Sequence, residues 1–573
     1  MKKLWTVLTA LAVGACATGG HTDAPAPVVA PLHSDFTQSY AKGSEYGPFL
    51  AATLAQESDE HARAAHYYME ALKADPTSRF VAERAFYQLL YAGRVGEAAK
   101  LAEGLIVGAA DQQDDLLQLT YVLEAYKRGD WQAVRERLTN QPKFGFGFIL
   151  KPLFTAWSYA AEGNEGAART ALKPLIADPR LKTIGEENLA YILDHLNQYD
   201  AAGKVYRTLI DGDKASSMQA MIAYAHMLYR SGQKDKARAF LSEKSKIYAN
   251  SQLLLREAVN ILSAEAPSLD TTTPDGAATA VFFRLAREFA HSRSPRAAII
   301  YLRLAAYLAP GNAEISVMLG DLFQQTDDAH DAAAAYAAVS PSSSLRRLAD
   351  IRRIEALEAA GHADKAEEEA RRLLKEKPDD PARLTLLANV LRGRENYAEA
   401  AERYSQVVDL LGKPDANDWF IFFSRGVCYE RLKDWQKAEG DMLAALKLNP
   451  GEASVLNYLG YSWIDRGVHI EEAKMLIAKA AKERPNDGFI IDSFGWVHYL
   501  TGDYPKAVEL LEKAVRLEPD DPTINDHLGD AYWRVGRRLE ARFQWRHALT
   551  GKPDEKDVQT IQHKLAYGLP DVP

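Results

Sequence analysis

Cysteine is nearly absent from this chain of 573 residues, which contains only Cys16 and Cys428. A disulfide framework needs paired cysteines, and a Cys-x-x-Cys metal or redox motif needs two of them close together. The sequence offers neither arrangement. We expect Cys428 to be a small packing residue, because no pattern of histidine and acidic residues beside it favours a catalytic thiol.

Positive charge is also in short supply. The chain has 69 lysines and arginines against 78 acidic residues, which gives a formal net charge of −9. Nucleic-acid phosphates require a basic surface, so this balance argues against nucleic acid as a partner. It argues equally against binding of the folded body to an anionic lipid surface.

The signature motifs of common enzymes are missing. The sequence contains no HExxH, no G-x-S-x-G, no P-loop and no G-x-G-x-x-G. His61 and His66 are five residues apart, a spacing that does not place two metal ligands on one helix face. We therefore predict no metal site, no cofactor and no enzymatic activity.

Long apolar runs are absent except at the start of the chain. Leu4–Val13 is an apolar run of ten residues after Lys2 and Lys3, too short to span a bilayer as a helix. The residues that follow, Val13-Gly14-Ala15-Cys16, resemble a bacterial lipobox, in which small residues precede a cysteine. The alternative is an ordinary secretory signal with an incidental cysteine.

The lipobox resemblance implies how the chain is held at a membrane. Residues 1–15 would be a lipoprotein signal peptide, and Cys16 would be lipidated on its sulfur and its amine. Two or more acyl chains make such anchoring stable. Ala17 after the cysteine resembles the export signal of outer-membrane lipoproteins that face the periplasm. Residues 16–45, which include Pro25, Pro27 and Pro31, read as a flexible tether with a reach of roughly 30 Å.

What the chain does contain is a repeat with a period of 34 residues. In residues 486–553, Gly495, Ala507, Ala514 and Pro519 recur as Gly529, Ala541, Ala548 and Pro553. Small residues at positions 8, 20 and 27 and proline at position 32 of a 34-residue unit are the tetratricopeptide repeat (TPR) pattern. Each unit is a pair of antiparallel helices, and one unit buries its apolar faces only against its neighbours.

The position-8 residue of each unit marks the repeat through nearly the whole chain. The markers are Ala52, Phe86, Val122, Ala156, Ala190 and Ala225, followed by Ala286, Gly320, Ile354, Ala388, Gly426, Gly460, Gly495 and Gly529. This spacing predicts an all-α solenoid, a right-handed superhelix of about fourteen helix-turn-helix repeats.

The quality of the repeat and its interruptions define the predicted domains. We expect a degenerate N-terminal array over 46–264, a linker over 265–276, a well-matched C-terminal array over 277–553, and a capping helix and tail over 554–573. Proline at position 32 should end the second helix of each unit. Aspartates such as Asp380 and Asp521 should cap the first helix of the next.

Close helix packing in the C-terminal array should depend on small residues. At positions 8, 20 and 27 these are Gly426, Ala438, Ala445, Gly460, Gly495, Ala507, Ala514, Gly529, Ala541 and Ala548.

Any function must come from the concave groove, which the first helix of each unit lines through positions 2, 5, 9, 12 and 13. The candidate binding residues in the best-matched units are Asn457, Tyr461, Asp465, Asp492, Trp496, Tyr499, Asp526, Asp530, Trp533 and Arg534. Trp, Tyr and Arg dominate binding energy at interfaces, and carboxylates beside them could hold basic side chains. The alternative is that Trp496 and Trp533 only pack against a neighbouring helix. His498 and His527 also fall on first helices, as packing or groove residues.

Three runs near the C-terminus carry a family resemblance. They are NYLGYSWIDRG over 457–467, IDSFGWVHYL over 491–500 and HLGDAYW over 527–533. Together with the lipobox, the tether and the order of weak then strong repeats, they resemble long proteobacterial TPR lipoproteins. The strong motifs cover about 110 residues, and the remainder is similar in layout only.

The resemblance implies an outer-membrane adaptor that binds and activates a periplasmic carboxyl-terminal processing protease, a serine protease, and presents cell-wall hydrolases to it. A second hypothesis is a scaffold of an envelope assembly, for exopolysaccharide export or regulation of peptidoglycan synthases. The third and weakest is a cell-surface enzyme. The sequence leaves the oligomeric state open.

Overall fold

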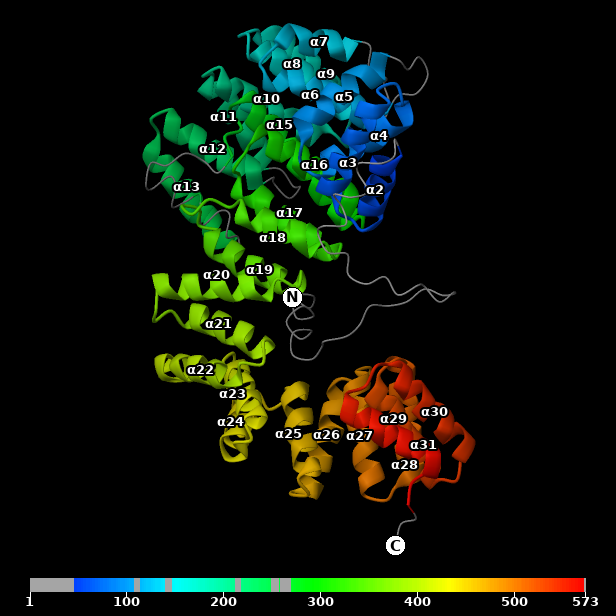
Figure 1. The fold of residues 1–573 in the computed structure, drawn as a ribbon. Coiled ribbons are helices and arrows are strands. Elements are labelled where there is room, and N and C mark those ends of the chain that lie inside the picture. The colour runs from blue at the N-terminus through cyan, green and yellow to red at the C-terminus, as the bar shows by residue number, and fades with distance from the viewer. Residues whose placement is uncertain are drawn as a thin grey trace. The chain divides into compact units, whose positions relative to one another are not determined.

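The computed structural model describes residues 46–107, 114–139, 147–211, 218–248, 257 and 269–570. Within these ranges all regular structure is helical, and the chain forms two compact units that divide between Ile315 and Ser316 (Figure 1). The predicted signal peptide, Cys16 and the tether over 16–45 lie outside the described ranges, as do residues 265–268 of the predicted linker. No helix in the described part of the chain combines the length and apolar character needed to cross a bilayer.

The first unit contains the helices from α2 to α16. Their bounds are α2 Gly47–Glu57, α3 His61–Ala74, α4 Arg79–Tyr91, α5 Val95–Val107, α6 Asp115–Lys127, α7 Trp131–Thr139, α8 Gly147–Ala160, α9 Glu165–Ala177, α10 Lys182–His195, α11 Tyr199–Ile210, α12 Met218–Arg230, α13 Lys234–Ile247, α15 Pro274–His291 and α16 Pro295–Leu308.

The second unit begins within α17 and runs to α31. Its helices are α17 Ala313–Gln325, α18 Ala329–Ala337, α19 Arg346–Ala359, α20 Ala363–Glu376, α21 Pro381–Gly393, α22 Tyr397–Leu411, α23 Trp419–Arg431, α24 Trp435–Leu448, α25 Ala453–Asp465, α26 Ile470–Glu483, α27 Gly488–Leu500, α28 Tyr504–Leu517, α29 Pro522–Arg534, α30 Arg538–Thr550 and α31 Glu555–Tyr567.

The helices pair as the 34-residue period predicts. There are six pairs from α2 to α13, the pair of α15 with α16, and seven pairs from α17 to α30. Every predicted position-8 marker lies in the first helix of its pair and is buried, including the degenerate markers Phe86 and Val122. The all-helical repeat architecture is therefore confirmed, even where the repeat signature is weak.

Close approach of the paired helices depends on the small residues. A Cβ added to Gly529 would lie 2.5 Å from the Trp545 ring, and one added to Gly460 would lie 2.7 Å from Ile477 Cγ1. Because real Cβ atoms do not come so near, a side chain at either position would push the two helices apart. The other eight predicted packing residues are buried as well.

Helix ends follow the local chemistry of the sequence. Asp380 and Asp521 accept hydrogen bonds from the backbone N–H groups that open α21 and α29, at 2.9 Å from Ala382 and from Ile524. Pro378 and Pro519 come directly after the C-cap residues, Lys377 of α20 and Glu518 of α28, where the chain leaves the helix. Gly502, with φ of 84°, makes the turn between α27 and α28 in the left-handed region that favours glycine.

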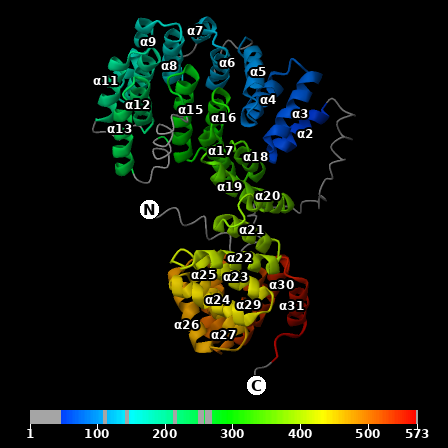
Figure 2. The ribbon, with the colours of Figure 1, turned by 90° about the vertical axis from the view of Figure 1, so that its left-hand side faces the viewer.

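The pair of α15 and α16 does not simply continue the row of repeats. Both views in Figures 1 and 2 show it running beside helices that precede it by more than a hundred residues. α16 packs against α4 and α5, and α15 packs against α8 and α10. The N-terminal unit therefore uses its own chain to cover part of the surface of its repeats.

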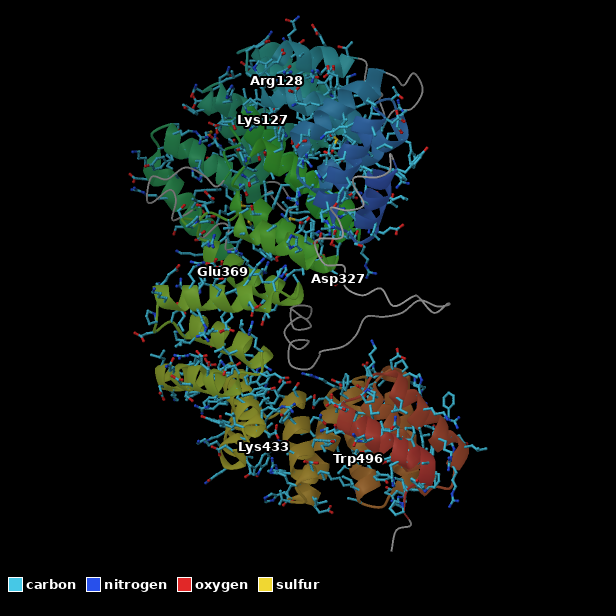
Figure 3. All side chains as sticks on the ribbon, viewed as in Figure 1. Lys127, Arg128, Asp327, Glu369, Lys433 and Trp496 are labelled. Carbon is cyan, nitrogen blue, oxygen red and sulfur yellow. The ribbon has the colours of Figure 1, made fainter. Side chains whose placement is uncertain are left out.

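Polar contacts fix α15 and α16 in this position. The Lys127 ammonium, at the end of α6 (Figure 3), lies 2.8 Å from the Asp275 carboxylate and 2.7 Å from the Leu308 carbonyl. Arg303 donates to the Tyr91 carbonyl at 2.8 Å, and the phenyl rings of Phe154 and Phe282 are 6.1 Å apart. We expected residues 277–308 to open the C-terminal array, but these contacts place them in the first compact unit, which extends to Ile315.

Candidate protein-binding groove

Three successive first helices, α25, α27 and α29, carry all ten predicted groove residues. α27 packs against both α25 and α29, so their side chains form one continuous row. Equivalent repeat positions lie side by side in this row. Position 5 is Asn457, Asp492 and Asp526 in the three helices, and position 9 is Tyr461, Trp496 and Asp530.

At the centre of the row, α27 and α29 are joined through a buried histidine. His527 Nδ1 lies 3.0 and 3.1 Å from the two carboxylate oxygens of Asp492, and its ring stacks on Trp496 with centroids 3.8 Å apart. Burial opposes a charged imidazolium, but the carboxylates of Asp492, Asp526 and Asp530 raise the pKa of His527 above its ordinary value. Trp496 also stacks on Tyr499 with ring centroids 4.6 Å apart, so its indole is held by neighbouring rings.

The last helix of the protein inserts a lysine into the same row. Lys564 of α31 places its ammonium 2.8 Å from both Asp526 and Asp530. Asp530, which is 5% exposed, also accepts from Trp545 Nε1 at 2.9 Å. Burial disfavours the Lys564 ammonium, but the two carboxylates more than offset this and raise the pKa of Lys564 above its ordinary value.

The residues that follow α31 cover the end of the row. Arg534 donates to the Pro570 carbonyl at 2.6 Å and to the Tyr499 hydroxyl at 3.3 Å. Gly568 lies against the six-membered ring of the Trp533 indole, so closely that a Cβ there would overlap it. Trp533 and Arg534 are thus covered by the chain's own C-terminal segment. Trp533 also packs on Trp545 of the neighbouring helix α30, as expected if its role is packing.

The polar groups on α25 have a different environment. Asn457, Tyr461 and Asp465 lie four residues apart on one helix face, and Asp465 at the helix end is exposed. Burial and the charges of Asp492 and Asp465 raise the pKa of Tyr461 to about 12. Within the described ranges, the Asn457 Oδ1 atom is buried without a hydrogen-bond partner, and Asp465 forms no ion pair.

The structure therefore brings all ten predicted residues onto adjacent helices but divides them into two groups. The residues on α27 and α29 have ion-pair or hydrogen-bond partners in His527, Lys564 and the segment that follows α31. The polar groups on α25 lack such partners within the described ranges. The role of Lys564 was not predicted from sequence. The available signal was the pair Asp526 and Asp530, four residues apart on one helix face, which requires a nearby cation when buried.

Two observations bear on the metal and cysteine chemistry of the described residues. No group of three or more His, Cys, Asp or Glu side chains within them has the geometry of a metal site. Cys428 is fully buried, and burial raises the pKa of its thiol to about 11, which leaves the thiol protonated and unreactive at neutral pH. Cys16, the predicted lipidation site, lies outside the described ranges.

Comparison with known proteins agrees with the class that this geometry defines. Models of the tetratricopeptide repeat match residues 317–381 and 385–453, and a TPR repeat model matches residues 495–536. The chain therefore contains tetratricopeptide repeats over these residues. Arrays of this kind are protein–protein interaction scaffolds.

Particular relatives share only parts of the chain. TPR repeat-containing protein PA4667 of Pseudomonas aeruginosa is 30% identical over 213 residues, which are 37% of this chain and 35% of that protein. The aspartyl/asparaginyl beta-hydroxylase of mouse is 28% identical over 167 residues, 28% of this chain and 22% of the hydroxylase. The matched regions thus span about a third or less of these curated relatives.

Solved structures of repeat proteins also align with the chain. The Cut9–Hcn1 hetero-tetramer of the APC/C aligns with a TM-score of 0.40 at 12% identity, covering 93% of this chain and 98% of that one. YrrB, described as a TPR protein with an unusual peptide-binding site, aligns with a TM-score of 0.22 at 17% identity, covering 38% of this chain and 93% of that one.

Proposed function

We propose that this TPR scaffold is a membrane-tethered adaptor of the LbcA type. In this role it binds and activates a periplasmic carboxyl-terminal processing protease and presents cell-wall hydrolases to it. The observation that carries the proposal is the row of aromatic and acidic side chains on α25, α27 and α29, which coincides with the motif-bearing residues 457–467, 491–500 and 527–533. Polar groups on α25 remain available there to a partner.

The proposed mechanism is tethering rather than chemistry. A lipid anchor at Cys16 and a flexible tether would confine the repeats to the outer-membrane surface that faces the periplasm. Binding a protease through one region and a substrate through another makes their encounter intramolecular, which can raise overall binding by orders of magnitude without any new contact. Such a function requires broad surfaces and no catalytic residue.

The test begins with the tagged, lipidated chain isolated from detergent-solubilised envelopes, with bound proteins identified by mass spectrometry. Recovery of a carboxyl-terminal processing protease together with cell-wall hydrolases is the expected result. The purified protease should then degrade a recovered hydrolase faster when the chain is added, and the chain alone should cleave nothing.

The Cys16→Ala variant is the matched control for the anchor. It should still stimulate the protease in solution but should no longer hold it at the membrane. Recovery of polysaccharide-export or peptidoglycan-synthase subunits without a protease would overturn the adaptor proposal in favour of an envelope scaffold. Turnover by the chain alone would overturn both.

A further inference from the structure

The position-5 side chains of α27 and α29 each meet a group supplied by the second helix further along the chain. Asp526 of α29 holds Lys564 of α31, and Asp492 of α27 holds His527 of α29. The equivalent position-5 residue of the preceding first helix is Asn457 of α25, a helix that packs against α27. Each carboxylate that lies deep in the row is therefore neutralised from within the chain.

The series breaks at α25 for a simple reason. The residue of α27 that corresponds to His527 is Ser493, at position 6 of its repeat. Its short side chain donates to the Phe489 carbonyl of its own helix at 3.0 Å. Asn457 Oδ1 is consequently left buried with no partner among the described residues.

The same surface has two further unpaired polar groups. Within the described ranges, the Tyr461 hydroxyl has no hydrogen-bond partner, and the exposed Asp465 carboxylate has no cation. Trp496 occupies the equivalent position to Tyr461 on the adjacent helix α27. We call Asn457, Tyr461, Asp465 and Trp496 the acceptor strip, because oxygen acceptors and a negative charge dominate it. The strip adjoins the part of the row that α31 already occupies.

We propose that the acceptor strip binds a lysine- or arginine-bearing segment of a partner protein, a proposal that rests on the protein-binding role inferred above. Lys564 shows the chemistry that this row accepts: a long apolar stem and an ammonium that meets two carboxylates. On the strip, the partner's cation meets Asp465, its stem lies along Tyr461, and a backbone or side-chain N–H donates to Asn457 Oδ1.

Charge and burial favour this occupant over others. An acidic segment would place like charges beside Asp465 and near Asp492, and a purely apolar one would leave Asn457 Oδ1 unsatisfied. A basic segment rich in N–H donors supplies a cation for Asp465 and a hydrogen-bond donor for Asn457 Oδ1. The aromatic side chains beside it supply the contact area that usually carries interface affinity.

The experiment uses the full chain and selects binders from a phage library of random twelve-residue peptides. The selected peptides are synthesised with a fluorophore, and their affinities are measured by anisotropy. We expect enrichment in lysine and arginine, and at least a tenfold loss of affinity with Asp465→Lys. Glu472→Lys is the matched control, because Glu472 is exposed on α26 of the same repeat and undergoes the same charge change.

The Tyr461→Ala variant provides a second test that does not change the charge, with an expected loss of at least fivefold. Asp465 is exposed at a helix end, so its replacement leaves the fold intact, which circular dichroism verifies. Selected peptides without basic residues, no selected peptide at all, or basic peptides that bind the Asp465→Lys and Glu472→Lys variants equally would each overturn the proposal. These results would leave the adaptor role standing if the protease were still recovered and stimulated.

Discussion

Removal of the Lys564 ammonium should loosen the C-terminal end of the protein. In Lys564→Met the apolar stem remains, but Asp526 and Asp530 lose the cation that lies 2.8 Å from each. The Lys564 side chain is 12% exposed, and those of Asp526 and Asp530 are 19% and 6% exposed, so neither carboxylate is fully hydrated after the change.

The magnitude follows from the burial of these groups. Breaking a buried ion pair by removing one partner costs about 3–5 kcal/mol. Asp526 retains some contact with water, and Trp545 Nε1 still donates to Asp530, so we expect the lower end, about 3 kcal/mol. In local hydrogen exchange this corresponds to a rate increase of about 150-fold, since each 1.36 kcal/mol is a factor of ten.

Hydrogen exchange measured by mass spectrometry over residues 555–567 is the appropriate assay. A long repeat array does not unfold in one step, and its end opens locally before the rest. Lys556→Met is the control, because Lys556 is exposed on the same helix and forms no ion pair within the described ranges. Its exchange should match that of the unmodified protein.

A second substitution separates the charge effect from a packing effect. Adding Asp530→Asn and Asp526→Asn to Lys564→Met removes the unpaired charges, and most of the lost protection should return. If Lys564→Met alone changes exchange of α31 by less than threefold, the ion pairs do not hold the helix and the reasoning fails. It also fails if the triple variant is no better protected than Lys564→Met.

Three further predictions concern the groove and its packing. Because the folded-state pKa of His527 is raised, protonated His527 stabilises the fold fully below about pH 6.5, and this stabilisation is lost as the pH rises through the folded-state pKa. Melting curves from pH 5 to 9 should show a falling melting temperature from this source, and His527→Gln should remove that pH dependence. Gly529→Ala should lower the free energy of unfolding by about 1–3 kcal/mol, because the added methyl group meets the Trp545 ring. Denaturant melts that show no change in this free energy would contradict the prediction. Asn457→Leu removes a buried unsatisfied acceptor, so the melting temperature should stay the same or rise while affinity for basic peptides falls; a lower melting temperature would mean that Asn457 does have a partner.

The helical register was predictable from sequence because it depends on local, periodic requirements. Glycine recurs where two paired helices come closest, as at Gly460 and Gly529. Aspartate recurs where a helix begins, as at Asp380 and Asp521. The identity of one residue therefore indicates the local structure around it. This held even for Phe86 and Val122, where bulk replaces the expected small residue but burial is kept.

What the sequence did not reveal were contacts between distant segments. The pairing of Lys127 with Asp275 joins residues 148 apart, and no local pattern in either segment indicates the other. The same holds for Lys564, which lies within the predicted capping helix and tail over 554–573. Its contacts with Asp526 and Asp530 depend on tertiary geometry. For the groove, sequence therefore indicated which positions line the row but not which of them the chain itself occupies.

The packing of α15 and α16 against earlier helices has a consequence for how the N-terminal unit is made. Its first repeats are synthesised well before the helices that cover them, since Arg303 meets Tyr91 only after 212 further residues have been added. At about 5–20 residues per second, this leaves those surfaces open for roughly 10–40 s. The first unit thus includes contacts of long sequence separation, and its completion waits for residues 274–308, whereas the second unit can assemble repeat by repeat as it emerges.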